Sequence, residues 1–488
     1  MAPYWLNNTC SPFFGTLADP YATSNTSSVS NASCSSGNLA VYAVDVDSAE
    51  TAATAFKFAI EKNIRLSIKN TGHDYIGRSN GRGSLALWTH NLKDTSFFNY
   101  TSTEYSGPAV KVSAGVQFKD LYKAAADNGL RLTGGSCPSV GMVGGYVQSG
   151  GHGPLGASYG LAADNTLEFE VVTTDGRHLT ASQSQNQDLY WALSGGGSGY
   201  VLVLSLTIKA HADGPVAGAA LSFPNTNPDS YWAAIEAFQS QVISLNQIPD
   251  LALSFGFDNS SFQLNMATWP DATKSDIENA LQPFLQRLNK LGINATQAAD
   301  VQNTFYAHFN KYAFPDEVYQ TNSTLGGWLI SPSMVQNNLS YIIDSYKTIV
   351  SDPSSSVKRI SANSGNVSYA HLGLTPGSNS VLEAWRDSLY TVNFALGYAP
   401  DASTTELQMV QAKVNSWQDL FKPLGGGSYI SEATYDDVDW KNDYFGTNYD
   451  RLLDIKQKYD PHFAIWQHTS VGMDAYWGLD GEGRLCRV

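Results

Sequence analysis

The chain has 488 residues, of which 42% are hydrophobic and 15% are charged, and its formal net charge is −15. The apolar content excludes an intrinsically disordered chain, and the length predicts two domains, because single hydrophobic cores stop growing at about 250 to 300 residues. The acidic balance opposes nucleic-acid and anionic-membrane partners, which need a basic surface, and no apolar run is long enough to span a bilayer. We therefore expect a soluble monomer with a neutral or cationic small-molecule partner.

The first strongly patterned segment is typical of a β-α-β unit. A strand is expected over 41–46, and a helix follows that begins after Ser48 and repeats apolar residues every three to four positions. A second strand is expected over 64–68. The unit ends in a glycine-bearing loop at 70–74, which contains a histidine and an aspartate.

A second segment repeats this order of elements. A strand is expected over 109–112, a helix over 118–128 and a short strand over 130–132. This segment also ends in a glycine-bearing loop, at 133–137, which contains a cysteine. We therefore predict a second β-α-β unit whose loop matches the first.

The remaining patterns divide the chain near residue 210. Strands are expected over 167–173 and 201–208, with a helix over 188–193 between them, and the small residues of 210–219 indicate a linker. Beyond it, strands and amphipathic helices predict an antiparallel sheet with helices on one face. The expected elements there are a helix from Ser230, a hairpin of 251–257 with 262–267, a helix over 277–291, a strand over 388–394 and a helix over 404–421.

The four cysteines are too few and too scattered for a zinc site, so no metal is expected. Cys10 and Cys34 are predicted to form a disulfide, and Cys486 is left without an evident partner if Cys137 binds a cofactor. Nine Asn-x-Ser/Thr sequons favour secretion as a glycoprotein. They begin at Asn7, Asn25, Asn31, Asn99, Asn259, Asn294, Asn322, Asn338 and Asn366.

The glycine-rich segment 134–153 is the strongest chemical signal in the sequence. Glycines let many backbone N–H groups approach a ligand without obstruction from a Cβ atom, which suits a pyrophosphate. The segment also contains a cysteine, a tyrosine and a histidine, which a flexible linker does not need. It has neither the Gly-Lys-Ser/Thr ending of a P-loop nor a strand-coupled Gly-x-Gly-x-x-Gly with its ribose carboxylate. We therefore predict a phosphate-bearing ligand that is bound in another manner.

Several segments resemble the vanillyl-alcohol-oxidase family of flavoproteins, and within it the berberine-bridge-enzyme branch with its secreted fungal members. The segments are 68–77, 134–153, 159–165, 194–199 and 448–461. The resemblance covers almost the whole chain and is weakest in the centre. It implies a two-domain α+β protein in which 1–210 and 430–488 form a PCMH-type FAD-binding fold. Residues 211–429 then form a substrate domain of antiparallel sheet plus helices.

The resemblance implies an FAD that is attached twice, through His73 to the 8α-methyl group and through Cys137 to C6 of the isoalloxazine. A lone histidine or cysteine is usually structural, but these two lie in the two matching loops, from which they can face one ligand. The same motifs supply the other positions expected to bind FAD. These are Asn70, Thr71, Gly72, Asp74, Gly77, Val140, Gly141, Gly144, Gly145, Gly151, His152, Leu155, Gly199, Val201, Gln467 and His468.

The residue three positions after the cysteine controls the access of dioxygen to the flavin in the family. Here it is Val140, whose small side chain implies an oxidase that releases hydrogen peroxide. The resemblance therefore predicts an FAD-linked oxidase that takes a hydride from an alcohol-type carbon. The expected partners are this small-molecule substrate and dioxygen.

In sugar-oxidising relatives a tyrosine near the C-terminus acts as the catalytic base. Glu432 is expected to occupy the place of that tyrosine here, so the catalytic base is expected at Glu432. An apolar cleft is expected to raise the pKa of this carboxyl toward the working pH. Further catalytic candidates are Tyr435, and also Tyr390 and Asn393 on a strand that is expected to roof the substrate site.

Two other functions stay open at this point. One is an oligosaccharide oxidase acting at the anomeric carbon, since the 26 tyrosines and 11 tryptophans offer surfaces for stacking on sugar rings. The other is a secreted flavoprotein or glycan-binding protein without turnover. The central region contains no motif that identifies a substrate.

Overall fold

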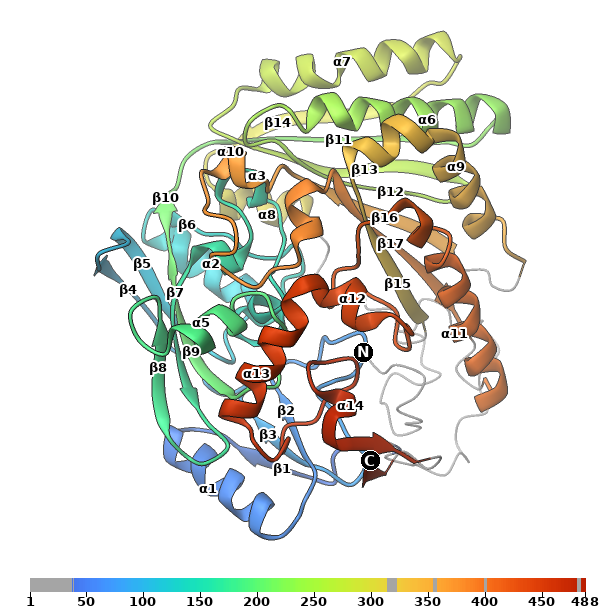
Figure 1. Cartoon of the computed structure of the whole chain (residues 1–488). Coiled ribbons are helices and arrows are strands. Elements are labelled where there is room, and N and C mark those ends of the chain that lie inside the picture. The colour runs from blue at the N-terminus through green and yellow to red at the C-terminus, as the bar shows by residue number, and fades with distance from the viewer. Residues whose placement is uncertain (1–36, 38, 314–322, 354–357, 399–401, 481–483) are drawn as a thin grey trace, which may run out of the picture.

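The structure is a computed structural model, and it describes residues 37, 39–313, 323–353, 358–398, 402–480 and 484–488. Its strands form a seven-stranded, a five-stranded and a three-stranded sheet and two small ribbons (Figure 1). No described helix is both long enough and apolar enough to cross a bilayer. The expected disulfide and four sequons lie outside the described residues, at Cys10, Cys34, Asn7, Asn25, Asn31 and Asn322.

The three-stranded sheet is parallel and contains the first predicted β-α-β unit, which is confirmed. Strand β3 lies between β1 and β2. Helix α1 begins after Ser48, whose hydroxyl accepts a hydrogen bond from the backbone N–H of Thr51, and it buries Ala52 and Phe56 against the sheet. The elements are β1 (Tyr42–Asp45), α1 (Ala49–Glu61), β2 (Leu66–Lys69) and β3 (Leu85–Trp88).

The five-stranded sheet is antiparallel, with the order β4-β5-β9-β7-β8. The expected second β-α-β unit is wrong, because β5 joins this sheet while β6 pairs with β10 in a separate ribbon. The local pattern locates the helix and both strands, but it does not show which other strand each of them pairs with. The elements are β4 (Thr95–Thr101), β5 (Ser106–Ser113), α2 (Phe118–Asp127), β6 (Leu130–Arg131), β7 (Thr166–Val172), β8 (His178–Ser182), α5 (Gln187–Leu193), β9 (Leu202–Lys209) and β10 (His211–Ala212).

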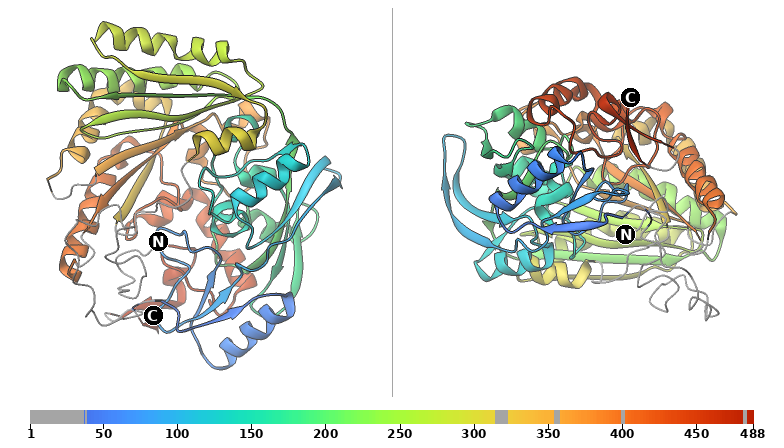
Figure 2. Two further views of the ribbon diagram at one scale, coloured as in Figure 1. Left: turned by 180° about the vertical axis from the view of Figure 1, so that it is seen from behind. Right: turned by 90° about the horizontal axis from the view of Figure 1, so that it is seen from below.

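The seven-stranded sheet is antiparallel, with the order β14-β11-β13-β12-β16-β17-β15. Four helices, α6, α7, α9 and α11, cover one face and enclose a large core, as the prediction required, and the other face turns toward the first half of the chain (Figures 1 and 2). The elements are β11 (Val216–Pro224), α6 (Pro228–Leu245), β12 (Ala252–Phe257), β13 (Ser261–Pro270), α7 (Lys274–Lys290), β14 (Thr296–Gln302), α8 (Phe305–Tyr312), β15 (Ser323–Ile330), α9 (Pro332–Val350), β16 (Lys358–Ser364), β17 (Tyr390–Gly397) and α11 (Thr404–Gln418).

The expected linker over 210–219 is wrong, because β10 and the start of β11 occupy it. Val216 and Ala217 are fully buried. The small residues serve close packing rather than flexibility, since a Cβ atom on Gly218 would lie 2.4 Å from a ring carbon of Tyr312 on α8. A run of small residues therefore indicates either a loop or a crowded strand.

The C-terminal segment packs against the first half of the chain. Ile430, Phe445 and Leu452 belong to the same hydrophobic cluster as Val110 and Phe118. The division into 1–210, 211–429 and 430–488 stays our proposal for the domain boundaries. The segment contains α12 (Trp440–Phe445), η6 (Gly446–Asn448), α13 (Tyr449–Tyr459), α14 (Met473–Tyr476), β18 (Trp477–Leu479) and β19 (Leu485–Arg487). The remaining short helices are η3 (Met142–Tyr146), α3 (Gly156–Tyr159), α4 (Ala162–Asn165), α10 (Tyr369–Leu372), η4 (Glu383–Asp387) and η5 (Lys422–Leu424).

Candidate functional site

A cavity of about 520 Å³ is bounded by the two glycine-bearing loops and the uncovered face of the seven-stranded sheet. This volume is typical of a small-molecule or cofactor site. Strands β15, β16 and β17 form its roof, and Tyr429, Ser431 and Glu432 close one side. The predicted positions that line it are Asn70, Thr71, Gly72, His73, Asp74, Cys137, Val140, Gly141, Gly144, Gly145, His152, Gly199, Val201, Gln467, Asn393 and Glu432.

His73 and Cys137 reach this cavity from the two loops and lie beside the same hydroxyl group. Oγ of Ser139 is 3.2 Å from Nε2 of His73 and 3.7 Å from Sγ of Cys137. Burial lowers the pKa of His73 to about 4, so its imidazole is neutral near pH 7 and keeps a nitrogen lone pair. The site thus brings together two side chains that can each bond covalently to an electrophilic ligand.

The glycine-rich segment packs too closely for side chains at several positions. A Cβ atom on Gly141 would lie 2.3 Å from Nδ2 of Asn70, and one on Gly153 would lie 1.8 Å from the carbonyl oxygen of Gly134. Nδ2 of Asn70 donates a hydrogen bond to the carbonyl oxygen of Ala114. Its Oδ1 is buried and has no hydrogen-bond partner among the described residues, so it is available to a ligand donor.

Glu432 lies at the cavity between two hydrogen-bond donors. Nε2 of His152 is 3.0 Å from Oε1, and Nδ2 of Asn393 is 2.7 Å from Oε2. Burial raises the pKa of Glu432, but the charge of His152 and the two hydrogen bonds outweigh that effect, so its pKa lies below the ordinary value. The expected rise is therefore wrong, because the cleft is polar at this point.

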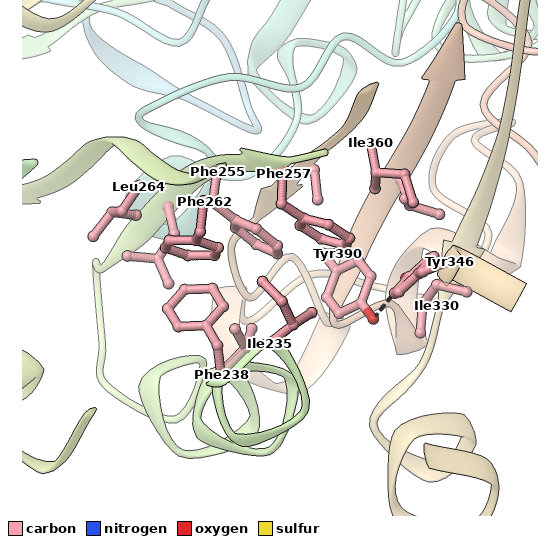
Figure 3. Packing of buried hydrophobic residues seen from close by; sticks show 14 of the residues in the cluster. Ile235, Phe238, Phe255, Phe257, Phe262, Leu264, Ile330, Tyr346, Ile360 and Tyr390 are labelled. Carbon is pink, nitrogen blue, oxygen red and sulfur yellow. Dashed lines mark hydrogen bonds between the residues drawn. The ribbon is translucent and has the colours of Figure 1, made fainter. Parts of the chain in front are cut away.

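Tyr390 lies in the core rather than at the cavity, so its prediction as a catalytic residue is wrong. It is three residues from Asn393 on β17, and successive strand residues alternate between the two faces. Its side chain is 1% exposed, packs against Phe255 and forms a 3.2 Å hydrogen bond with the hydroxyl of Tyr346 (Figure 3).

Five other predicted positions do not line the cavity. Tyr435 and His468 stack on each other with ring centroids 3.9 Å apart, and burial lowers the pKa of His468 to about 4. Leu155 is fully buried in the core, and Gly77 and Gly151 have positive φ angles of 77° and 73° in turns. Their assignment to the FAD site therefore stays a prediction.

Among the lining residues that were not predicted, two groups carry charged or polar side chains that matter for the chemistry of the cavity. Arg78 is buried and holds the 70–79 loop, since its Nε donates a hydrogen bond to Oδ1 of Asp74 at 2.9 Å. Arg359, Ser361 and Asn363 alternate on β16, a strand that the sequence did not reveal. The four-residue spacing of Asp74 and Arg78, and the alternation of polar residues at 359–363, were the available signals.

A cluster of three aspartates in the C-terminal segment already holds a cation. Nζ of Lys422 lies 2.6 Å from Asp437, 3.2 Å from Asp439 and 3.0 Å from Asp443. Burial lowers the pKa of Lys422, but the carboxylates of Asp437 and Asp443 raise it by more, so the pKa lies well above the ordinary value. The ammonium group takes the place that a metal ion would need.

Two protein-family models match the chain in the regions that form the cavity. Residues 40–182 match the FAD binding domain model, and residues 414–472 match the model described as berberine and berberine like. The first match contains both glycine-bearing loops, and the second contains Glu432 and Gln467.

Full-length relatives extend these matches. A VAO-type flavoprotein oxidase of Thermothelomyces thermophilus is 39% identical over 472 residues, which are 93% of this chain and 80% of the relative. An FAD-linked oxidoreductase of Aspergillus clavatus is 37% identical over 473 residues, or 93% of this chain and 79% of the relative.

Solved structures share the fold. The crystal structure of a VAO-type flavoprotein from Myceliophthora thermophila matches with a TM-score of 0.86 and 38% identity, covering 93% of this chain and 83% of the other. The glucooligosaccharide oxidase of Acremonium strictum matches with a TM-score of 0.73 over 89% of this chain and 92% of its own, at 20% identity, which shows the fold alone. The chain therefore belongs to the VAO-type FAD flavoproteins, within their berberine-bridge-enzyme-like branch.

Proposed function

We propose that the chain is a secreted oxidase that oxidises the CH–OH carbon of a small alcohol and passes the electrons through bicovalent FAD to dioxygen. The observation that carries this proposal is the convergence of His73, Cys137 and Glu432 on one cavity. The first two are the proposed attachment points of the flavin, and the third is the proposed proton acceptor. Hydrogen peroxide is the expected product of dioxygen.

The residues of the cavity fit an FAD. A neutral imidazole and a thiol face it from two loops, and the glycine-rich wall leaves room for a flat ligand. Oδ1 of Asn70 and Oε1 of Gln148 are buried acceptors without hydrogen-bond partners among the described residues, as expected where a ligand would donate. FAD supplies the two-electron acceptor that amino-acid side chains lack.

The proposed role of Glu432 is to take the proton of the substrate hydroxyl. Its lowered pKa keeps the carboxylate ionised near neutral pH, and Asn393 and His152 fix one oxygen each. The rings of Trp385 and Tyr429 pack against His152, with centroids 5.5 and 5.2 Å away, and limit its movement. One proton is thus held at Glu432 during oxidation of the alcohol carbon.

The roof favours this function over oxidation of oligosaccharides. Stacking on a sugar ring needs an aromatic platform, and the described residues of the roof strands offer none, whereas Tyr75, Tyr146 and Tyr429 line other walls of the cavity. The described lining residues of the roof strands are Ser323, Leu325, Arg359, Ser361, Asn363, Asn393 and Ala395. A flavoprotein without turnover would show no reduction of its flavin by any alcohol, and a screen for peroxide release over alcohols and sugars tests this directly.

The double attachment gives the sharpest test of the proposal. We expect His73→Ala or Cys137→Ala alone to keep the flavin on the acid-precipitated polypeptide, because the other bond remains. The double variant should release all of its flavin under the same treatment. Absorbance of the pellet and supernatant measures both, and free flavin from the unmodified protein would rule out a covalent bond.

A second prediction concerns the access of dioxygen. Val140 is half-buried and lines the cavity, so Val140→Ile adds one methylene there with little disturbance of the fold. Reoxidation of the reduced flavin should slow by about tenfold, which corresponds to roughly 1.4 kcal/mol of barrier. Stopped-flow mixing with oxygenated buffer measures the rate. Val140→Ala is the matched control and should not slow reoxidation, while equal rates in all three proteins would remove Val140 from the mechanism.

A further inference from the structure

The roof of the cavity carries a cation, Arg359, that has no carboxylate partner among the described residues. Of the charged groups that line the cavity, Arg78 pairs with Asp74, and Glu432 pairs with His152. Arg359 forms no ion pair with any carboxylate in the described part of the chain. Its Nη2 donates a hydrogen bond to Oε1 of Gln263, a neutral acceptor, at 3.0 Å.

Its strand presents Arg359 to the cavity and its packing orients the side chain along the sheet. Arg359 alternates with Ile360, which is fully buried on the helix-covered face. A Cβ atom on Gly256 of β12 would lie 3.1 Å from both Nε and Nη2 of Arg359. The guanidinium therefore lies over β12 at Gly256, where the missing side chain leaves room for it.

The register of the sheet relates this cation to the proposed proton acceptor. Asn393 on β17 pairs with Ser361 on β16, Ser361 pairs with Gly256 on β12, and Gly256 pairs with Gln263 on β13. Asn393, which binds Glu432, and the guanidinium over Gly256 thus lie in one row across the roof, two strands apart. Adjacent strands are about 4.8 Å apart, so the separation is about 10 Å.

We infer that Arg359 binds a carboxylate of the substrate, so that the substrate is a hydroxy acid. Its alcohol carbon lies near Glu432, and its carboxylate lies at the far end of the row, beside the guanidinium of Arg359. A guanidinium is suited to this task, because its fork of N–H donors matches a carboxylate. The inference rests on the proposed function, which defines the alcohol end.

The preference for an acid must be local, because the net charge of the chain is −15. The whole-protein field therefore opposes an anion, and a single guanidinium within the cavity has to reverse that effect. A preference for the acid would therefore come from Arg359 itself and not from the net charge of the protein. The experiment needs a control variant with the same change of charge elsewhere on the strand.

Binding without turnover tests the inference on the flavin-loaded protein. The probes are 4-methylbenzoate and 4-methylbenzamide, which match in shape, lack the alcohol and differ in charge. Calorimetric titration should show tighter binding of the acid to the unmodified protein. Arg359→Gln should weaken binding of the acid by about tenfold to a hundredfold and leave binding of the amide unchanged, because only the acid loses charge-assisted hydrogen bonds to the guanidinium.

Two further variants separate this role from folding and from net charge. Gln263→Glu keeps Arg359 but places a carboxylate against it, so it should abolish the preference for the acid as well. Lys358→Gln removes one positive charge from the same strand at a residue outside the cavity lining, and it should change nothing. Equal binding of acid and amide by the unmodified protein, or an equal loss in Lys358→Gln, would overturn the inference.

Turnover of the matched alcohols then tells the two proposals apart. 4-(Hydroxymethyl)benzoate should reduce the flavin at lower concentration than 4-(hydroxymethyl)benzamide, and Arg359→Gln should remove that difference. A preserved preference for the acid without flavin reduction by either alcohol would count against the oxidase function alone. Reduction by both alcohols at equal concentrations would count against the role of Arg359 alone.

Discussion

Glu432→Gln is expected to slow flavin reduction by alcohols by about 10² to 10⁴, the usual range for the loss of a general base. Glutamine keeps the size and shape of the side chain, but its amide cannot take a proton at neutral pH. Anaerobic stopped-flow mixing measures the reduction rate. Reoxidation by dioxygen should stay unchanged, because it does not need this proton acceptor, and the flavin should stay bound to the polypeptide.

The pH dependence of flavin reduction should reflect the lowered pKa of Glu432. Because the pKa of Glu432 is lowered, its carboxylate form persists as the pH falls through the mildly acidic range. As the pH falls, the rate of flavin reduction should therefore stay constant until the pH approaches the lowered pKa of Glu432. Asn393→Ala removes one of the hydrogen bonds that lower the pKa, so its acid limb should move to higher pH. If Glu432→Gln reduces its flavin as fast as the unmodified protein, the base is another residue.

Local sequence patterns predicted the parts of the fold that depend on neighbouring residues. Helix α1 begins after Ser48 because its hydroxyl caps the helix three residues on, which is a local interaction. The two glycine-bearing loops were located for the same reason, since Gly72 in the first loop has a φ of 86°, a conformation that favours glycine. The assignment of His73 and Cys137 to the flavin came from the resemblance to the family, together with their places in these loops.

Features that depend on distant residues were not predictable in this way. The pKa of Glu432 is set by His152, 280 residues earlier, and by Asn393, 39 residues earlier, and neither contact is visible in the local pattern. The partners of β5 and β6 likewise depend on β9 and β10. Arg359 was not predicted, because its strand lacks a continuous apolar pattern. Its neighbours across the sheet are also remote in sequence.

A buried ion pair beside the cavity gives the largest expected effect on stability. Nζ of Lys456 lies 2.5 Å from Oδ2 of Asp460 and 2.5 Å from the carbonyl oxygen of Gly199, and it donates to the carbonyl oxygen of Ile465 at 2.8 Å. Lys456→Met should lower the free energy of unfolding by about 3–5 kcal/mol, because it leaves a buried carboxylate without its counter-charge. Chemical denaturation followed by circular dichroism measures the change.

The same helix offers a matched control for this prediction. Lys458 is two residues away on α13 and lies 2.6 Å from Asp188, but its side chain is 60% exposed, whereas that of Lys456 is 3% exposed. Lys458→Met should change the free energy of unfolding by no more than about 1 kcal/mol, because water screens an exposed pair and solvates the remaining carboxylate. If both variants lost a similar free energy of unfolding, burial of Lys456 would not be the cause of its contribution to stability. Since Lys456 also holds the carbonyl of Gly199, which lines the cavity, only Lys456→Met should in addition shift the absorbance of the bound flavin.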